Sequence, residues 1–337
     1  MNEFEVHYRY LRQSAGVIDL SARSRVCVTG ADRQRFINGQ VTNNVKDLKV
    51  GQGCYAALVT AKGKMESDLF IYCLLDELLL DFEPGLAQTV TARLEKYIIA
   101  DDVQIVDVSG LYGMLTVQGP RSADVIQVLG LQPSSAHLNW TSVSHENAGE
   151  IYCMNNPRGT GVGFDVFVPS AQHGAMRDRL AQAAATVEGG VSTGEALEIV
   201  RIEAGIPRFG IDMDQANLAP EAGVEARAIS YNKGCYIGQE VISRIRAFGQ
   251  VAKSLRGLRL PDSLSQLPAR GEKLFRDGKE VGYLTSACRS PALQANIALG
   301  YVRREHNTAG IQLQIGSPDS AVTASVCDLP FVRSGAD

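Results

Sequence analysis

Hydrophobic and polar residues follow two different patterns along the chain, and the change falls near residue 250. Before it, short apolar runs alternate with segments in which apolar residues recur every three or four positions, the spacing of an amphipathic helix. After it, short β-like segments follow one another with only turns between them. The sequence therefore predicts a mixed helix and strand region followed by a small antiparallel barrel or sandwich.

The clearest elements of the first region are a hairpin and a helix. Apolar runs at 69–75 and 78–82 are separated by Asp76-Glu77, which predicts a β-hairpin. From Leu86, apolar residues recur at helical spacing. Further strands are expected at 17–20, 25–28, 103–108, 111–117 and 163–168, and further helices at 32–38, 171–185 and 193–204.

The second region contains the strongest turn signal in the chain. Asp277-Gly278 lies between two β-like segments and is typical of a tight hairpin. The expected strands are 254–260, 272–276, 279–286, 296–302, 312–315 and 321–328. We therefore expect a domain at 1–250, split internally near 110, and a barrel at 251–330.

Composition excludes several classes of protein. Of 337 residues, 45% are hydrophobic and 21% are charged, and the formal net charge is −4. A protein that mainly binds phosphate backbones usually carries a basic excess, so direct nucleic-acid binding is disfavoured. No apolar run reaches the roughly 18 residues of a membrane span, and the acidic start lacks signal-peptide order. A cytoplasmic location is expected.

Seven cysteines and five histidines give no metal-ligand spacing, so no metal site is expected. Most of the cysteines lie in apolar strings and are interpreted as small buried hydrophobic residues. Cys235 differs because its neighbours are polar. It precedes a predicted helix and follows Lys233 by two residues, and both features favour a thiolate. A tight turn with an incidental cysteine is equally compatible with this segment.

Two other segments have structural explanations. Residues 190–194 have the spacing of a hydrolase nucleophile elbow, but Ser192 is better explained as the cap of the next helix, with Glu195 completing a capping box. Glu203 lies near the end of that helix, where a negative charge opposes the helix dipole. It needs a partner, which is Arg201, Arg208 or a ligand donor, and a paired structural glutamate is the simpler interpretation.

The segment Lys233-Gly234-Cys235-Tyr236-x-Gly238-Gln239-Glu240 resembles the signature of the YgfZ family, the folate-binding relatives of glycine-cleavage T-protein. The similarity extends over roughly residues 10–250. It also includes the segments 30–43, 60–68, 118–120, 201–212 and 220–223, which are shared with T-protein more broadly.

This resemblance implies an α+β, three-lobed T-protein-like fold with a C-terminal antiparallel β-barrel and a channel for tetrahydrofolate or a derivative. It implies an accessory role in iron–sulfur cluster assembly or repair, with assembly proteins and client iron–sulfur enzymes, including tRNA-modifying ones, as partners. The residues it assigns are Cys235 and Lys233 as catalytic, Glu203, Tyr236 and Arg244 as folate-binding, and Gly234, Gly238, Gln239 and Glu240 as motif residues.

One departure from the T-protein pattern affects the expected activity. T-protein enzymes place a folate-contacting aspartate just after the strand that corresponds to 78–82, whereas residues 84–92 contain no carboxylate here. Only Asp81 and Glu83 are nearby. We therefore expect that the chain is not an aminomethyltransferase. A folate-dependent aminomethyltransferase or demethylase is the alternative, and a scaffold that has lost its ligand is a third.

Overall fold

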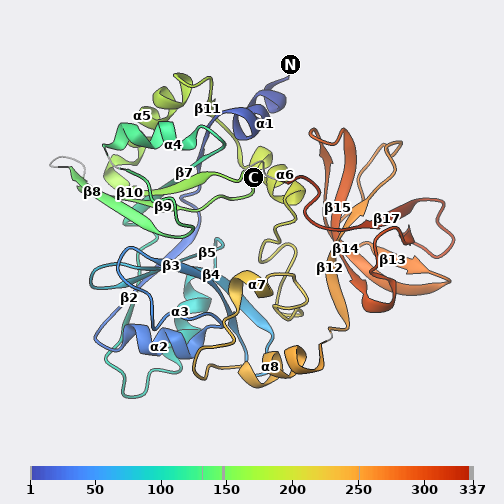
Figure 1. Ribbon diagram of the computed structural model, residues 1–337, viewed down its shortest axis with the longest axis horizontal. Coiled ribbons are helices and arrows are strands. Elements are labelled where there is room, and N and C mark those ends of the chain that lie inside the picture. Colours follow the sequence, from blue (N-terminus) through green and yellow to red (C-terminus); the bar gives the residue numbers. More distant parts are fainter. Residues whose placement is uncertain (1, 131, 146–148, 250, 334–337) are drawn as a thin grey trace. The chain divides into compact units, whose positions relative to one another are not determined.

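The computed structural model describes residues 2–130, 132–145, 149–249 and 251–333 (Figure 1). The chain forms two compact units, each made of segments that are discontinuous in sequence. The first contains Met1–Thr60, Glu66–Leu197 and Arg227–Ile237, and the second contains Ala61–Met65, Glu198–Ala226 and Gly238–Asp337. The predicted boundaries near 110 and 250 stay predictions.

A five-stranded sheet in the first unit carries the residues that matter most below. Its strand order is β3-β4-β5-β2-β6. Fully buried Leu58, Leu69 and Leu80 form one core together with residues of α2 and α3. The elements are β2 (Ser24–Thr29), α2 (Arg33–Gln40), β3 (Gly53–Val59), β4 (Met65–Cys73), β5 (Leu78–Phe82), α3 (Ala87–Glu95) and β6 (Gln104–Asp107).

A six-stranded sheet completes the first unit, with the order β11-β1-β7-β10-β9-β8. Its core packs Leu115 and Val166 against Leu180 of α5. The elements are α1 (Glu3–Gln13), β1 (Gly16–Asp19), β7 (Tyr112–Gln118), α4 (Ser122–Ile126), η1 (Gln127–Leu129), β8 (Trp140–His145), β9 (Gly149–Asn155), β10 (Gly163–Pro169), η2 (Ser170–Gln172), α5 (His173–Ala185) and β11 (Gly190–Val191).

The second unit contains a closed antiparallel barrel with the order β12-β15-β14-β13-β16-β17. Asp277 and Gly278 have φ angles of 50° and 75°, as the left-handed positions of a two-residue hairpin require. The strands are β12 (Lys253–Arg259), β13 (Lys273–Arg276), β14 (Lys279–Ser290), β15 (Ala295–Arg303), β16 (Gln312–Ile315) and β17 (Thr323–Cys327). The remaining elements are α6 (Gly194–Glu203), α7 (Glu225–Ala228), α8 (Gln239–Phe248) and η3 (Arg304–His306).

The structure confirms the predicted fold class, including the C-terminal barrel and the antiparallel hairpin of β4 and β5. The predicted start of α6 is wrong by one residue. Thr193 Oγ1 accepts a hydrogen bond from the Ala196 N–H at 3.3 Å, while the Ser192 hydroxyl donates to the His7 carbonyl. Thr193 therefore caps the helix, and Ser192 anchors the N-terminal helix α1.

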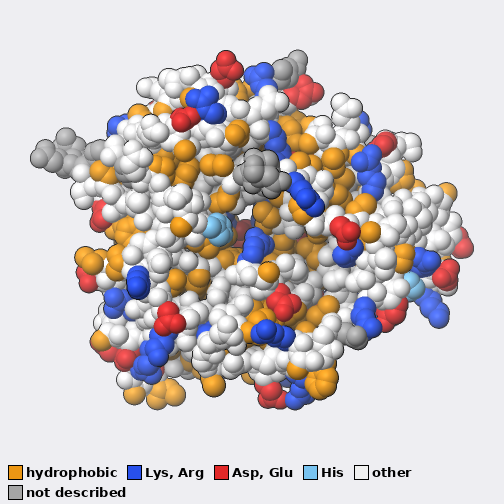
Figure 2. Space-filling view, in the orientation of Figure 1, with side chains coloured by type: hydrophobic (Ala, Val, Ile, Leu, Met, Phe, Trp, Pro, Cys, Tyr) orange, Lys and Arg blue, Asp and Glu red, His pale blue; other side chains and the backbone are white. Residues whose placement is uncertain are grey.

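Charged side chains of both signs are intermixed over the face shown in Figure 2. Within the described residues, no helix has both the length and the apolar character needed to cross a membrane.

Candidate active site

Asp68 on β4 is a buried carboxyl group with an unusual environment. Its residue is 8% exposed, and Tyr55 on β3 donates its hydroxyl to Asp68 Oδ2 at 2.8 Å. Among the described residues, no cation lies within ion-pair distance of it. Burial, followed by the nearby negative charge of Glu83, raises the pKa of Asp68 to about 6. A carboxyl group that titrates near neutrality is typical of acid–base chemistry.

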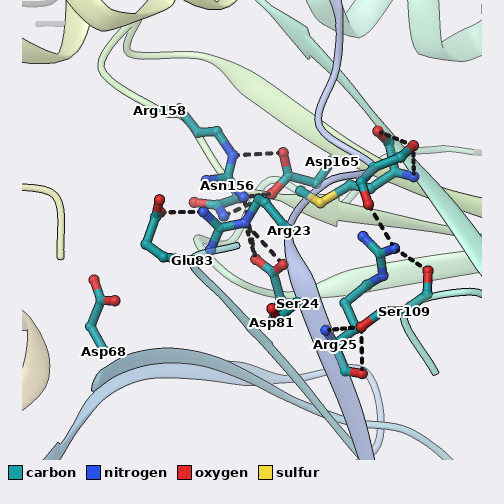
Figure 3. Close-up of polar contacts among 12 residues, drawn as sticks. Arg23, Ser24, Arg25, Asp68, Asp81, Glu83, Ser109, Asn156, Arg158 and Asp165 are labelled. Atoms are coloured by element: carbon teal, nitrogen blue, oxygen red, sulfur yellow. Dashed lines mark hydrogen bonds and ion pairs between the residues drawn. The ribbon is translucent and has the colours of Figure 1, made fainter. Parts of the chain in front are cut away.

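Glu83 is held in place by Arg23, which precedes β2. The Arg23 guanidinium binds both oxygens of Asp81 through Nε, at 2.9 and 3.0 Å, and binds Glu83 through Nη1. Asp81 is fully buried and Arg23 is 6% exposed. Figure 3 shows Asp68 beside Glu83 at the end of this network, with no hydrogen bond or ion pair to the other residues drawn.

Arg158 extends the network to the six-stranded sheet. Its guanidinium binds Asp165 on β10 at 3.0 and 2.7 Å and reaches Asp81 at 3.5 Å. Asn156 also donates to Asp165, at 2.8 Å. The two sheets of the first unit are therefore joined by buried ion pairs.

The aromatic rings of Phe70 and Tyr55 lie next to the guanidinium groups of this network. The guanidinium carbons of Arg23 and Arg158 lie 5.8 and 5.3 Å from the ring centre of Phe70. Phe70 is two residues from Asp68 on β4, and its ring lies 5.1 Å from that of Tyr55 with a tilt of 45°. The carboxyl group of Asp68 thus adjoins a pair of aromatic rings.

Arg227 of α7 borders the same tyrosine. Its guanidinium carbon lies 5.3 Å from the centre of the Tyr55 ring. The Asn43 amide donates to the carbonyl groups of both residues, at 2.9 Å to Tyr55 and 3.0 Å to Arg227, which fixes their backbones together. Burial, with a smaller contribution from the positive charge of Arg227, lowers the pKa of His137.

Lys233 has a structural environment that the sequence did not indicate. Its ammonium group donates to the backbone carbonyls of Asn38, Val41 and Asn43 at 2.5, 2.7 and 2.8 Å. An ammonium group has three donors, so all of them are used at the C-terminal end of α2. Burial lowers the pKa of Lys233 to about 8. The three donors of Lys233 are thus used by carbonyl groups and not by Cys235, and its proposed effect on the Cys235 thiol stays a prediction.

Cys235 is exposed, as expected, whereas the other six cysteines are buried or partly buried. Helix α8 begins at Gln239 and not at Gly238, whose φ of 84° belongs to the preceding turn. Within α8, Arg244 and Glu240 form an exposed ion pair at 2.7 Å. The structure leaves the chemical role of Cys235 as a prediction.

Glu203 and Tyr236, two of the predicted folate contacts, are buried, with Glu203 fully so. Glu203 accepts a hydrogen bond from the Ser290 hydroxyl of β14. The neighbouring Arg201 pairs instead with Glu198 and Asp212. The assignments of Glu203, Tyr236 and Arg244 to folate binding stay predictions.

A pocket of about 750 Å³ lies elsewhere in the first unit, lined by residues of α1 such as Tyr10, by the turn after α5 with Glu188, and by Arg121 before α4. It contains none of the residues described above, and its lining shows no buried acid or base comparable to Asp68. Asp68 is therefore the candidate for acid–base chemistry among the residues described above.

Residues 3–233 match the model of the GCVT N-terminal domain, and residues 253–333 match the glycine cleavage T-protein C-terminal barrel domain. The chain belongs to the glycine cleavage T-protein family. It is 29% identical over 329 residues to an aminomethyltransferase of Halalkalibacterium halodurans, covering 96% of this chain and 88% of that protein. An aminomethyltransferase of Ralstonia pickettii is 30% identical over 350 residues, with 99% and 90% covered.

The crystal structure of the glycine cleavage system aminomethyltransferase T from Bartonella henselae superposes with a TM-score of 0.86. It shares 22% sequence identity and covers 98% of this chain and 89% of that one, which shows the common fold. A putative chloroplastic transferase of Arabidopsis thaliana is 28% identical over 317 residues, covering 92% of this chain and 70% of that protein.

These relatives correct one expectation from the sequence. The absence of a carboxylate at 84–92 suggested that the chain is not an aminomethyltransferase, yet near full-length relatives carry that name. The expectation rested on residues 84–92 alone. Asp68 lies on β4, the strand before β5, at the end of the segment 60–68 that is shared with T-protein. Its burial and its proximity to Glu83 were not visible in the local pattern.

We predict that Asp68 makes stability depend on pH. Its pKa rises on folding from 3.8 to about 6, so its contribution is fully present below pH 4 and is lost as pH rises through 6. The loss amounts to about 3 kcal/mol. Asp68→Asn, measured by urea unfolding, should match the wild type near pH 4 and exceed its stability at pH 8. The exposed Asp47→Asn variant should show no such divergence, and parallel curves for Asp68→Asn would contradict the prediction.

We also predict that Lys233 acts mainly on stability. Lys233→Met leaves three carbonyl groups at the end of α2 without their donor, so the free energy of unfolding should fall by about 2–3 kcal/mol. Cys235→Ser is the matched control, because the exposed thiol should change stability by less than about 0.5 kcal/mol. Equal stabilities of the Met variant and the wild type would exclude this role.

Proposed function

We propose that the protein is a folate-dependent aminomethyltransferase, which moves a one-carbon unit from an amine to tetrahydrofolate. The proposal is supported by the names of near full-length relatives and, within this chain, by the buried carboxyl group of Asp68. That carboxyl group is the observation on which the proposal depends most.

The surroundings of Asp68 fit a pterin ring. A carboxylate can accept two parallel N–H bonds from the edge of an aminopterin, and the adjacent rings of Tyr55 and Phe70 offer apolar surface to a flat heterocycle. When bound, tetrahydrofolate supplies ring nitrogens that accept the one-carbon unit. Glu203, Tyr236 and Arg244 are proposed as further folate contacts on the strength of the sequence resemblance.

The reaction requires proton transfers at the atoms that lose and gain the carbon. The carbon of an aminomethylated carrier loses its bonds to the amine and to the carrier, and each of these leaving groups takes up a proton. The same carbon forms bonds to two nitrogens of tetrahydrofolate, and each nitrogen gives up a proton. Asp68 can accept a proton from an acceptor nitrogen and return it to the departing amine, because its pKa of about 6 makes both forms accessible near neutral pH. Tyr55 orients the carboxyl group through its hydroxyl hydrogen bond.

Asp68→Asn should lower kcat by about 10²–10⁴, the usual contribution of a positioned acid or base. The measurement is methylene transfer to tetrahydrofolate from an aminomethylated carrier. Binding of tetrahydrofolate, measured by calorimetry, should weaken as well, because the amide is a poorer acceptor for the pterin N–H groups, so kcat is compared at saturating tetrahydrofolate. Asp47→Asn is the control at an exposed carboxylate. Undiminished transfer by Asp68→Asn would exclude Asp68 from the chemistry.

A second candidate function is the folate-binding accessory role in iron–sulfur cluster assembly or repair, and the exposed thiol of Cys235 favours it. One thiolate does not hold a cluster, since clusters usually take about four protein ligands. Within the described residues, no group of three or more potential metal-ligating side chains is present. The role proposed for Cys235 is therefore a transient contact with a partner's cluster or thiol.

One experiment distinguishes the aminomethyltransferase from the accessory role in iron–sulfur cluster assembly or repair. In a strain lacking the endogenous factor, Cys235→Ser should fail to restore tRNA thiolation if the accessory role holds, while transfer to tetrahydrofolate in vitro stays unchanged. Full restoration by the Ser variant would reject the accessory role.

A further inference from the structure

The pocket of about 750 Å³ in the first unit takes no part in the chemistry proposed for Asp68. Three segments form its walls: the second half of α1, the turn before α4, and the turn between α5 and β11. Figure 1 shows α1 beside β11, which this last turn precedes. A volume of this size accommodates a small organic molecule. The polar side chains in the lining that the argument uses are Arg9, Tyr10, Gln13, Arg121 and Glu188.

Ser14 ties the three walls of this pocket together. Its hydroxyl donates to the carbonyl of Val187, and its own carbonyl accepts from the N–H of Arg121 at 2.9 Å. The ring of Tyr10 packs against the backbone of Gly190, where a Cβ atom would lie 2.9 Å from the ring. The walls are therefore held in place without a ligand, so a bound molecule would not have to order them.

The polar side chains of the pocket have donors to spare. Within the described parts of the chain, Arg9 and Gln13 make no side-chain hydrogen bond or ion pair. Arg121 binds Asp124 through Nε, which leaves its two terminal nitrogens for another acceptor. Arg9 and Arg121 are both exposed, so a solute can reach them. Two guanidinium groups that line one pocket match a doubly charged anion such as a phosphate group, which offers three oxygens to their planar donor edges.

Glu188 gives the same pocket a negative charge. Its φ angle is 61°, in the left-handed region that residues other than glycine rarely adopt. A glycine would take this conformation without strain, so the turn itself does not explain a glutamate at this position. The carboxylate makes no ion pair or hydrogen bond to another described residue. Because it repels a phosphate group and accepts only from donors, it is complementary to hydroxyl or amine groups on the rest of a ligand.

We propose that this pocket binds a small phosphorylated molecule that also carries hydroxyl groups, either a sugar phosphate or a nucleotide. The phosphate lies at Arg9 and Arg121, and the hydroxyl groups donate to Glu188. The amide of Gln13 adds a further donor beside Arg9, four residues away on the same face of α1. This site is separate from Asp68 and goes beyond the proposed function, because it adds a second ligand and no chemical step.

The test is a calorimetric titration of the full-length protein with ribose phosphate, ribose and inorganic phosphate. Ribose phosphate should bind roughly tenfold or more tightly than either of the others, because it alone satisfies both ends of the pocket. Arg9→Gln should weaken ribose phosphate binding by a similar factor. Arg177→Gln, at an exposed arginine of α5, is the matched control and should change nothing. Tighter binding of adenosine monophosphate than of ribose phosphate would identify a nucleotide site, and equal or weaker binding a sugar phosphate site.

Glu188→Gly tests the acidic end of the pocket separately. This variant removes the left-handed strain, so it should unfold at a higher temperature than the wild type while losing the preference for ribose phosphate over inorganic phosphate. A preference that survives the substitution would overturn the role of the carboxylate.

Three further outcomes would overturn the site as a whole. They are no binding of ribose phosphate, equal binding of inorganic phosphate, which would mean an adventitious ion only, and unchanged binding by a variant that combines Arg9→Gln with Arg121→Gln. Asp68→Asn should bind ribose phosphate as the wild type does, so a failure of the proposed aminomethyl transfer leaves this test unaffected.

Discussion

The buried ion pairs of Arg23, Asp81, Arg158 and Asp165 are the constraint on which the rest of the first unit depends. Taking these charges out of water is expensive, and the cost is offset only while every partner is present. The network spans β5 and β10, which belong to different sheets, so it fixes the sheets against each other. Through Arg23 it also holds Glu83, and thereby sets the electric field at Asp68.

The environment of Asp68 lowers the stability of the folded protein at neutral pH. Asp68 has a hydroxyl hydrogen bond but no counter-ion among the described residues, so its ionised form is disfavoured in the folded protein. A purely structural carboxylate in the same core would be expected to have an arginine, as Asp81 and Asp165 have. Perturbed carboxyl groups of this kind are concentrated at functional sites. Tyr55 contacts both Asp68 and Arg227 and lies at the centre of the proposed site.

The sequence predicts the barrel well because the residues that determine each of its strands and turns are neighbours in the chain. Asp277-Gly278 can adopt left-handed backbone angles more easily than most residues, and this alone sets the hairpin of β13 and β14. The site at Asp68 depends instead on contacts between distant residues. Tyr55 and Glu83 lie on other elements, and Arg227 comes from the far end of the unit's sequence. No local pattern reports their proximity, so the residues after β5 give no indication of Asp68 on β4, the carboxylate of the proposed site.

The segment around Cys235 shows that even residues two positions apart in the sequence need not bind one another in the structure. Lys233 and Cys235 are two residues apart, which favoured an interaction between thiol and ammonium. The structure turns the lysine inward, where its three donors bind carbonyls about 190 residues earlier in the chain. It leaves the cysteine in solvent. One short motif can therefore contain both a buried lysine with a structural role and an exposed cysteine. Lys233 has no hydrogen-bond donor left for Cys235, because all three donors bind carbonyl groups.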